Sequence, residues 1–294
     1  MQRSGTTLEG RILSKNPALH IIHEPLNKEY GLKGVEQVYP CDLSKEQGVF
    51  YLESLYSFLN GKAGYIRHST LDSLPKALAR RISGGRTAVD YMKLRLKVLS
   101  GQRPMPVLKD PFEVLLSEKL IENQHKVIAL IRHPAAIWHS IKRMGWAFSY
   151  LNFDFPQIFR ELGIETPAPP SDDLSEIEKF AWLWVVIYSY LLRLVDKEGF
   201  LLIKHEDLCI APYEELERME IFFEVNKSSY SRDFINRNMF ANTVTPSGNQ
   251  IHAFERDSAS LASAWCGKLG KEEDTIQKIC GSLVEKYYGS WSPR

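Results

Sequence analysis

Four short apolar runs, each ending at polar or chain-breaking residues, constrain the fold of this 294-residue chain most strongly. A buried strand of a parallel sheet has this form, because both of its faces are covered by helices. Longer segments with helical patterning lie between the runs. This alternation predicts an α/β fold with a mostly parallel sheet flanked by helices. The runs are 19–24, 106–110, 127–134 and 200–207, and the helical segments are 88–100, 112–124, 135–144 and 174–197.

The first residues, MQRSGTTLEGRIL, predict an anion-binding loop at the start of a helix. Glycine and small hydroxyl residues precede a helix-compatible segment, and the N-terminus of a helix attracts anions such as phosphate or sulfate. A loop of this P-loop type normally follows a buried strand. No such strand precedes the loop in this sequence, so we expect the first strand of the sheet to be missing at the N-terminus.

Composition excludes several classes of protein. Lysine and arginine total 37 against 36 aspartate and glutamate, so no overall positive field would recruit nucleic acid. The four cysteines are far apart and lack metal-site spacing, which predicts reduced, structural thiols. The most apolar run, 180–195, is shorter than a membrane span and contains Arg193, so we expect a buried helix and no membrane span.

Polar residues at the ends of the predicted strands are the first candidates for a site, because ligands of parallel sheets collect at the carboxyl ends of the strands. For Glu206 and Asp207, the residues that follow favour an ordinary helix start. Arg132 ends its run, and Ser140 lies two turns along the next helix. An arginine and a hydroxyl in this arrangement could hold one phosphate between them. The remaining candidates are Glu24, Lys109, Asp110 and His133.

Two motifs together resemble a known family. RSGTT near the N-terminus and LIRHPAAIWHSIKR, with Arg132 eight residues before Ser140, are similar to the sulfotransferases that use 3′-phosphoadenosine-5′-phosphosulfate. The HEPLN motif and the C-terminal segment 262–289 are more similar to the carbohydrate sulfotransferases. The resemblance implies one sulfotransferase domain over 1–294, with acceptor-side insertions around 27–104 and 144–175.

The resemblance also implies a donor site in this chain. The first motif corresponds to the loop for the 5′-phosphosulfate, and the second corresponds to the element for the 3′-phosphate. Trp265 lies in a segment that folds over the donor in relatives, although a core tryptophan is the commoner case. The implied donor-binding residues are Arg3, Ser4, Gly5, Thr6, Thr7, Arg132, Ser140 and Trp265, with Arg256, Ser258 and Lys268 as further candidates.

The implied reaction is in-line attack of an acceptor hydroxyl on sulfur, with 3′-phosphoadenosine 5′-phosphate as the leaving group. Arg3 would stabilise charge on the leaving side, and Lys109 would reach the phosphosulfate or the acceptor, unless it is a surface lysine. Glu24 is the favoured general base, followed by His23 and then His133. Thr6 stands where a nucleotide triphosphatase loop has lysine, so we expect no magnesium requirement and no bound metal.

Two other functions compete with this interpretation. A P-loop kinase or nucleotide hydrolase would need the loop lysine and a metal-binding acid, for which Asp110 is the candidate. A homologue that binds carbohydrate but has lost the donor site is the second alternative. The acceptor is expected to be a carbohydrate, and the aromatic segment 146–159 is either a loop over it or part of the core. We expect a cytoplasmic protein, or a secretory-lumen enzyme if an anchor lies upstream of Met1; the sequence leaves the oligomeric state open.

Overall fold

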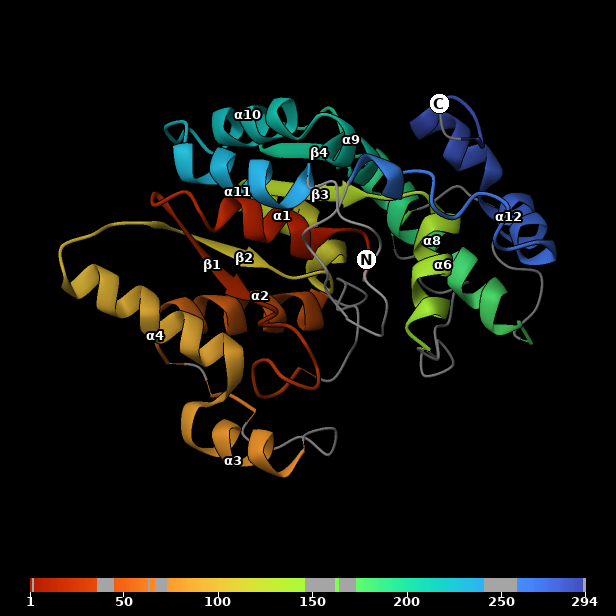
Figure 1. Cartoon of the computed structure of the whole chain (residues 1–294). Helices are drawn as coiled ribbons and strands as arrows, with labels where there is room; N and C mark the ends of the chain where they lie inside the picture. Colours follow the sequence, from red (N-terminus) through yellow and green to blue (C-terminus); the bar gives the residue numbers. More distant parts are fainter. Residues whose placement is uncertain are drawn as a thin grey trace. The chain divides into compact units, whose positions relative to one another are not determined.

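The computed structural model describes residues 1, 3–35, 45–62, 64–66, 73–145, 162–163, 173–240 and 258–292. The chain divides into two compact units, one formed by Met1–Gly5 with Glu118–Arg294 and the other by Thr6–Ser117. Each unit contains a two-stranded parallel sheet with helices packed beside it (Figure 1). A single domain over 1–294 with the two insertions stays a prediction, and most of the second insertion lies outside the described residues.

The unit Thr6–Ser117 is built around strands β1 (Leu19–His23) and β2 (Met105–Lys109). They pair in parallel, with Leu19 opposite Met105 and His23 opposite Lys109, so both strands end at the same edge of the sheet. Helices α1 and α4 pack against β1. The helices of this unit are α1 (Thr6–Leu13), α2 (Lys45–Leu59), α3 (Leu74–Ser83), α4 (Gly85–Leu99) and the 3-10 helix η1 (Glu113–Leu116).

A compact turn follows β1 and fixes the residues after the strand. The backbone N–H of Leu32 donates to the carbonyl of Pro25 at 2.8 Å, and that of Gly31 donates to the carbonyl of Asn27 at 2.7 Å. A Cβ atom on Gly31 would lie only 2.1 Å from the Pro25 carbonyl oxygen. Only glycine therefore fits at this point of the turn.

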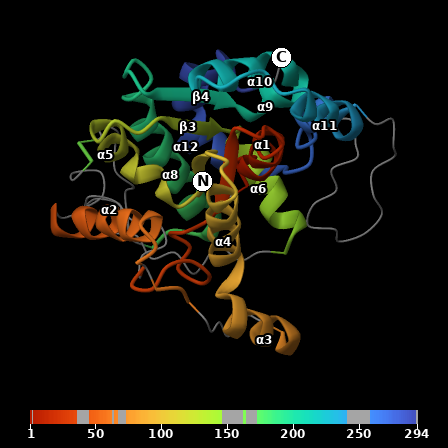
Figure 2. The same ribbon diagram turned by 90° about the vertical axis from the view of Figure 1, so that its left-hand side faces the viewer.

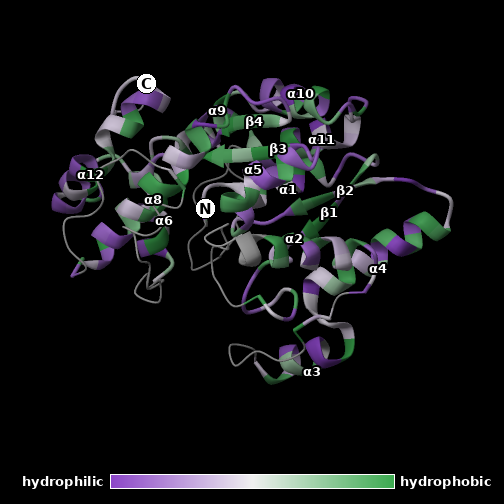
Figure 3. Ribbon diagram, turned by 180° about the vertical axis from the view of Figure 1, so that it is seen from behind, coloured by the Kyte–Doolittle hydropathy of each residue, from purple (hydrophilic) through white to green (hydrophobic). Residues whose placement is uncertain are grey.

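The second unit is built around β3 (Val127–Ile131) and β4 (Phe200–Lys204), which also pair in parallel. Helices α9 and α10 pack against β4 (Figure 2). Figure 3 colours both strands mainly as hydrophobic, as expected for buried strands. The helices of this unit are α5 (Ser117–Glu122), α6 (Pro134–Arg143), α8 (Glu176–Leu192), α9 (His205–Ile210), α10 (Pro212–Phe222), α11 (Ser229–Met239), the 3-10 helix η2 (Ala259–Leu261) and α12 (Lys271–Tyr288).

Helix α8 forms the core of this unit. Trp184 and Tyr188 are fully buried, and their polar atoms donate to backbone carbonyls at the end of β3: Trp184 Nε1 to Arg132 at 3.0 Å and Tyr188 Oη to Leu130 at 3.1 Å. Tyr287 of α12 donates through its Oη to the carbonyl of Tyr188 at 2.6 Å. These aromatic side chains bury large apolar rings and still satisfy their polar atoms. Residues 180–192 of the apolar run therefore form a largely buried helix, as predicted, whereas Arg193 and Val195 lie beyond its end and are exposed.

The fold class predicted from the sequence is confirmed: the protein is mixed α/β, with parallel strands flanked by helices. Each of the four predicted apolar runs overlaps a strand, and each strand ends one to three residues before its run does. Glu206 and Asp207 lie in the first turn of the short helix α9, in agreement with the interpretation that the sequence favoured. Within the described part of the chain, no helix combines the length and apolar character needed to cross a bilayer.

Candidate functional site

Three side chains that the sequence assigned to donor binding come together in the unit that contains β3. The Arg3 Nε donates to the Ser140 Oγ at 3.0 Å, and the Arg132 Nη1 donates to the Arg3 carbonyl at 2.9 Å. Arg132 directly follows β3, and Ser140 lies on α6, as the motif predicted. We call Arg3, Arg132 and Ser140 the arginine–serine cluster.

Arg132 has a donor that the described residues leave unused. Its Nε is buried and has no hydrogen-bond partner among the residues that the structure describes. Burial lowers the pKa of the guanidinium, and the nearby Glu206 carboxylate opposes that shift. A buried, unpaired N–H is costly, and an anion held against the guanidinium would satisfy it.

The loop residues before α1 have constrained conformations. Gly5 has a φ of +106°, and a Cβ atom there would lie 2.0 Å from the His205 ring, so the position requires glycine. Ser4 is buried and donates through its Oγ to the Met1 carbonyl at 2.7 Å. Thr6 and Thr7 begin α1, so the predicted loop does lead into a helix N-terminus.

His133 and Trp265 form a stacked pair in the same unit. Their ring centroids are 4.4 Å apart and the ring planes differ by 9°, and both residues are buried. Burial lowers the pKa of His133 to about 3, so this imidazole is neutral and a weak proton acceptor. His133 is therefore a weaker base than an ordinary histidine, and its role as third candidate base stays a prediction. The contact of Trp265 with the donor stays a prediction.

The sequence did not identify the part that Glu206 and Tyr288 play beside Arg132. Glu206 accepts hydrogen bonds from the His133 backbone N–H at 3.0 Å and from the Tyr288 Oη at 2.9 Å. Burial raises the pKa of Glu206, while the His133 N–H and the Arg132 guanidinium oppose that rise. The position of Glu206 near the end of a predicted strand could have pointed to it. Tyr288 lies in a C-terminal helix, and nothing in the sequence around it suggests a role.

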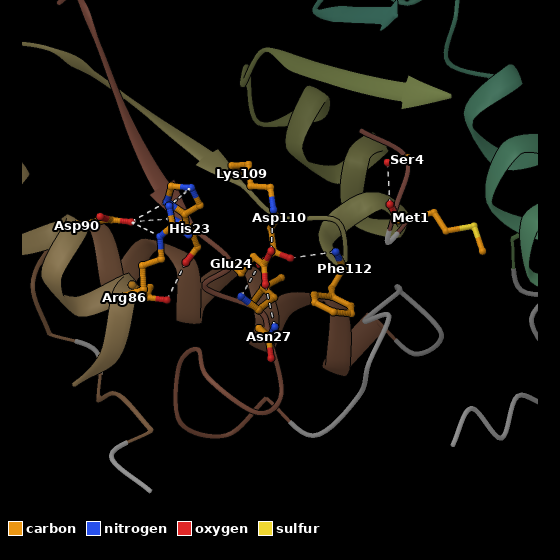
Figure 4. A network of polar contacts seen from close by, with 12 residues as sticks. Met1, Ser4, His23, Glu24, Asn27, Arg86, Asp90, Lys109, Asp110 and Phe112 are labelled. Atoms are coloured by element: carbon orange, nitrogen blue, oxygen red, sulfur yellow. Dashed lines mark hydrogen bonds and ion pairs between the residues drawn. The ribbon is translucent and has the colours of Figure 1, made fainter. Parts of the chain in front are cut away.

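The two favoured candidate bases, Glu24 and His23, and the predicted Lys109 lie in the unit Thr6–Ser117, at the edge where β1 and β2 end (Figure 4). Lys109 Nζ contacts Glu24 Oε1 at 2.6 Å, and Asn27 Nδ2 donates to Glu24 Oε2 at 2.9 Å. Lys109 is only 8% exposed, so it is not a surface lysine. Glu24 adopts a φ of +49°, an uncommon conformation for a residue other than glycine. The turn after β1 and this ion pair together hold its carboxylate in place.

The electrostatic surroundings keep Glu24 ionised. Burial opposes the charged form, but the Lys109 ammonium and the hydrogen bonds from Lys109 and Asn27 outweigh it, so the pKa of Glu24 lies below its usual range. Glu24 therefore exists as a carboxylate at neutral pH and is able to accept a proton.

Asp110 lies beside this pair and has a structural role. Its carboxylate accepts the backbone N–H of Leu26 at 2.6 Å and that of Phe112 at 2.9 Å. Burial raises the pKa of Asp110 to about 7, against the effect of these two hydrogen bonds. Both of its oxygens are bound to the backbone, so Asp110 holds the segments after β1 and β2 together.

His23, the second candidate base, has partners of its own. Its Nδ1 lies 2.8 Å from Asp90 Oδ2, and its Nε2 lies 2.8 Å from the Arg86 Nη2. The Thr87 hydroxyl donates to the His23 carbonyl at 2.7 Å. Both ring nitrogens of His23 are therefore engaged with residues of α4.

The structure says little about the remaining candidates that the sequence suggested for the donor and acceptor sites. Arg256 and the segment 146–159 lie outside the described residues. Ser258 is buried and its backbone N–H donates to the Met239 carbonyl at 3.0 Å, while Lys268 is exposed. The described residues contain no group of three or more histidine, cysteine, aspartate or glutamate side chains arranged to hold a metal ion. Metal independence stays a prediction.

Comparison with solved structures identifies the fold of this chain. The sulfotransferase domain from the curacin biosynthetic pathway superposes with a TM-score of 0.50 at 16% identity, over 96% of this chain and 94% of that chain. The sulfotransferase domain of the Synechococcus PCC 7002 olefin synthase aligns with a TM-score of 0.44 at 18% identity, over 96% of this chain and 91% of that chain. Sulfotransferase STF9 from Mycobacterium avium aligns with a TM-score of 0.40 at 11% identity, over 97% of this chain and 74% of that chain. No protein-family model and no curated protein matches the sequence. The first likeness shows that the chain has the fold of a sulfotransferase domain.

The buried carboxyl of Glu9, near Lys109, generates a stability prediction. Burial raises the pKa of Glu9 from 4.5 to about 8, against the attraction of the Lys109 ammonium. Between these two values the folded state keeps a proton that the unfolded state releases, so this group destabilises the protein as pH rises, by about 1.4 kcal/mol per pH unit. Glu9→Gln should match the wild-type stability near pH 4.5 and exceed it increasingly up to pH 8. Urea unfolding at several pH values measures this difference, with the exposed Glu29→Gln as control. Parallel pH profiles for Glu9→Gln and wild type would contradict the assignment.

Proposed function

We propose that this protein transfers a sulfuryl group from 3′-phosphoadenosine-5′-phosphosulfate to a hydroxyl group of an acceptor. The arginine–serine cluster carries this proposal, because it combines two guanidinium groups, one of which has a buried N–H with no partner among the described residues, and a hydroxyl. Such a set of donors suits a doubly charged phosphate or sulfate ester. The sulfotransferase-domain fold supports the same reaction class.

The donor is bound by residues of both sequence motifs in this proposal. Arg132 and Ser140 bind the 3′-phosphate, and Arg3 stabilises the charge that develops on the leaving 5′-phosphate. The Gly5 backbone and the first turn of α1, with Thr6 and Thr7, supply N–H and hydroxyl donors for the phosphosulfate. Ser4 supports the loop through its bond to Met1, and Trp265 covers the nucleotide.

The chemical step is an in-line displacement at sulfur. The acceptor oxygen forms a bond to sulfur, the bond from sulfur to the 5′-phosphate oxygen breaks, and 3′-phosphoadenosine 5′-phosphate leaves. Glu24 accepts the hydroxyl proton and later releases it to solvent. When Glu24 is protonated, Lys109 loses its anionic partner, and its ammonium becomes available to stabilise negative charge on the transferring group.

The proposed acceptor is a carbohydrate, because the HEPLN motif and the C-terminal segment resemble those of the carbohydrate sulfotransferases. A kinase or nucleotide hydrolase is less well supported, because both oxygens of Asp110 accept backbone hydrogen bonds and Thr6 stands at the loop-lysine position. A homologue that has lost donor binding would not need the cluster of arginines beside Ser140. The reaction itself needs no metal in this proposal, and the compartment stays a prediction.

Donor binding is tested at Arg132. Arg132→Ala should weaken binding of 3′-phosphoadenosine 5′-phosphate by about 2–4 kcal/mol, because the phosphate loses a buried charged partner. Isothermal titration calorimetry on folded protein measures the change. The control is Arg237→Ala, which removes an exposed arginine of α11 in the same unit. Equal affinities for wild type and Arg132→Ala would refute the donor site.

The role of Glu24 is tested by Glu24→Gln, which keeps the size and most hydrogen bonds of the side chain. Loss of the general base should lower turnover by roughly 10²–10⁴-fold, while affinity for 3′-phosphoadenosine 5′-phosphate is unchanged. Transfer of radioactive sulfate from the donor to a panel of oligosaccharides measures turnover, with Glu29→Gln as the matched exposed control. A melting temperature for each variant separates lost chemistry from lost folding. If Glu24→Gln turns over within about threefold of wild type, the loss is far smaller than that expected for a missing general base. That result would contradict the role of Glu24 and make His23 the next candidate base.

A further inference from the structure

A pocket of about 400 Å³ lies between β1 and α4 in the unit Thr6–Ser117, and the proposed reaction does not use it. We call it the α4 pocket and define it by His20, His23, Asp90, Lys93, Leu96 and Lys97. Its volume falls in the range of small-molecule sites. All of its residues belong to one compact unit, so the pocket is complete within that unit.

Hydrogen bonds fix the polar floor of the α4 pocket. Asp90 Oδ2 lies 2.8 Å from the His23 Nδ1 and accepts the His23 backbone N–H at 3.3 Å. The carbonyl oxygen of Asp90 lies 2.7 Å from the His20 Nε2. Burial opposes the charge on Asp90, but the hydrogen bond and charge of His23 and the charge of Arg86 outweigh it and lower its pKa. The carboxylate is thus ionised and already engaged with the protein.

The wall formed by α4 carries two lysines that no described carboxylate pairs with. Lys93 and Lys97 lie one turn apart on the helix, and neither has an ion-pair partner within the described ranges. Arg86, on the same helix, has a 68% exposed side chain and lies 4.0 Å from Asp90. Two lysines and one carboxylate therefore line the pocket, while Arg86 pairs with Asp90 and His23 outside the lining, and the pocket attracts anions.

Apolar side chains complete the pocket. Leu19 and Ile21 of β1 line it, and Leu96 lies on α4 between the two lysines, with 62% of its surface exposed. Leu19 and Ile21 are 1% and 6% exposed, so a bare inorganic anion would leave mainly Leu96 in contact with water. An organic molecule that carries an anionic group would cover Leu96 and still pair with the lysines.

We propose that the α4 pocket binds the anionic group of a small organic molecule, a carboxylate, sulfate ester or phosphate ester, with the apolar part of the ligand against Leu19, Ile21 and Leu96. Lys93 and Lys97 pair with the anion. The Asp90–His23 pair forms the fixed floor on which the ligand rests. None of the proposed donor-binding residues lines this pocket, so the inference does not depend on the reaction being sulfuryl transfer.

Phenyl phosphate is the probe, titrated into the full chain by calorimetry, with inorganic phosphate and benzyl alcohol as the two partial ligands. Phenyl phosphate should bind at least about tenfold more tightly than either, because each lacks one of the two interactions. The double variant Lys93→Gln, Lys97→Gln should bind phenyl phosphate about tenfold more weakly than wild type, as expected for the loss of two ion pairs. Arg95→Gln is the matched control, because Arg95 is an exposed cation of the same helix that does not line the pocket. It should change affinity less than about twofold, the size of a screened long-range effect.

Three results would overturn the proposal. Benzyl alcohol binding as tightly as phenyl phosphate would show an apolar pocket only. Equal weakening by Arg95→Gln and by the double lysine variant would show diffuse attraction to a basic helix. Loss of phenyl phosphate binding in the presence of saturating 3′-phosphoadenosine 5′-phosphate would assign the anion to the donor site. Circular dichroism and melting temperatures establish that each variant is folded.

Discussion

The ion pair between Lys109 and Glu24 organises the edge where β1 and β2 end. Parallel pairing brings the two strand ends to one side of the sheet, and the 2.6 Å contact joins them. Burying two charges is costly, and removing one partner of such a pair typically costs about 3–5 kcal/mol because the other charge remains buried. The surrounding bonds from Asn27 and from Asp110 to the backbone offset that cost. The residues that carry the proposed chemistry are thus also residues that stabilise this edge of the sheet.

The unit that contains β3 uses a different arrangement. There Arg132 leaves the end of β3, donates to the Arg3 carbonyl, and retains a buried Nε without a protein partner in the described structure. Ser140, on the following helix, accepts from Arg3. A site that leaves a strong donor unpaired sacrifices stability for ligand binding, which is common where function and stability compete. This is why the cluster carries the proposed donor role.

The sequence predicted the strands well because each is a short apolar run that ends at a breaking residue, a purely local signal. It also placed Arg132 and Ser140 correctly, since a strand end and the next helix are close along the chain. It could not predict that Asp90 would bond to His23 or that Glu206 would accept the His133 N–H, because those partners lie 67 and 73 residues apart. Such contacts depend on tertiary packing, which leaves no periodic pattern. The roles of the predicted site residues remain predictions.

Nucleotide preference in the absence of magnesium tests the central claim most directly. Calorimetry in the presence of EDTA compares 3′-phosphoadenosine 5′-phosphate with ATP, and both titrations are repeated with magnesium. The account predicts that the 3′-phosphorylated nucleotide binds at least about tenfold more tightly than ATP and that magnesium leaves this preference unchanged, since Arg3, Arg132 and Ser140 supply the donors for the phosphates. Tighter binding of ATP that requires magnesium would contradict the account and favour a P-loop kinase or hydrolase.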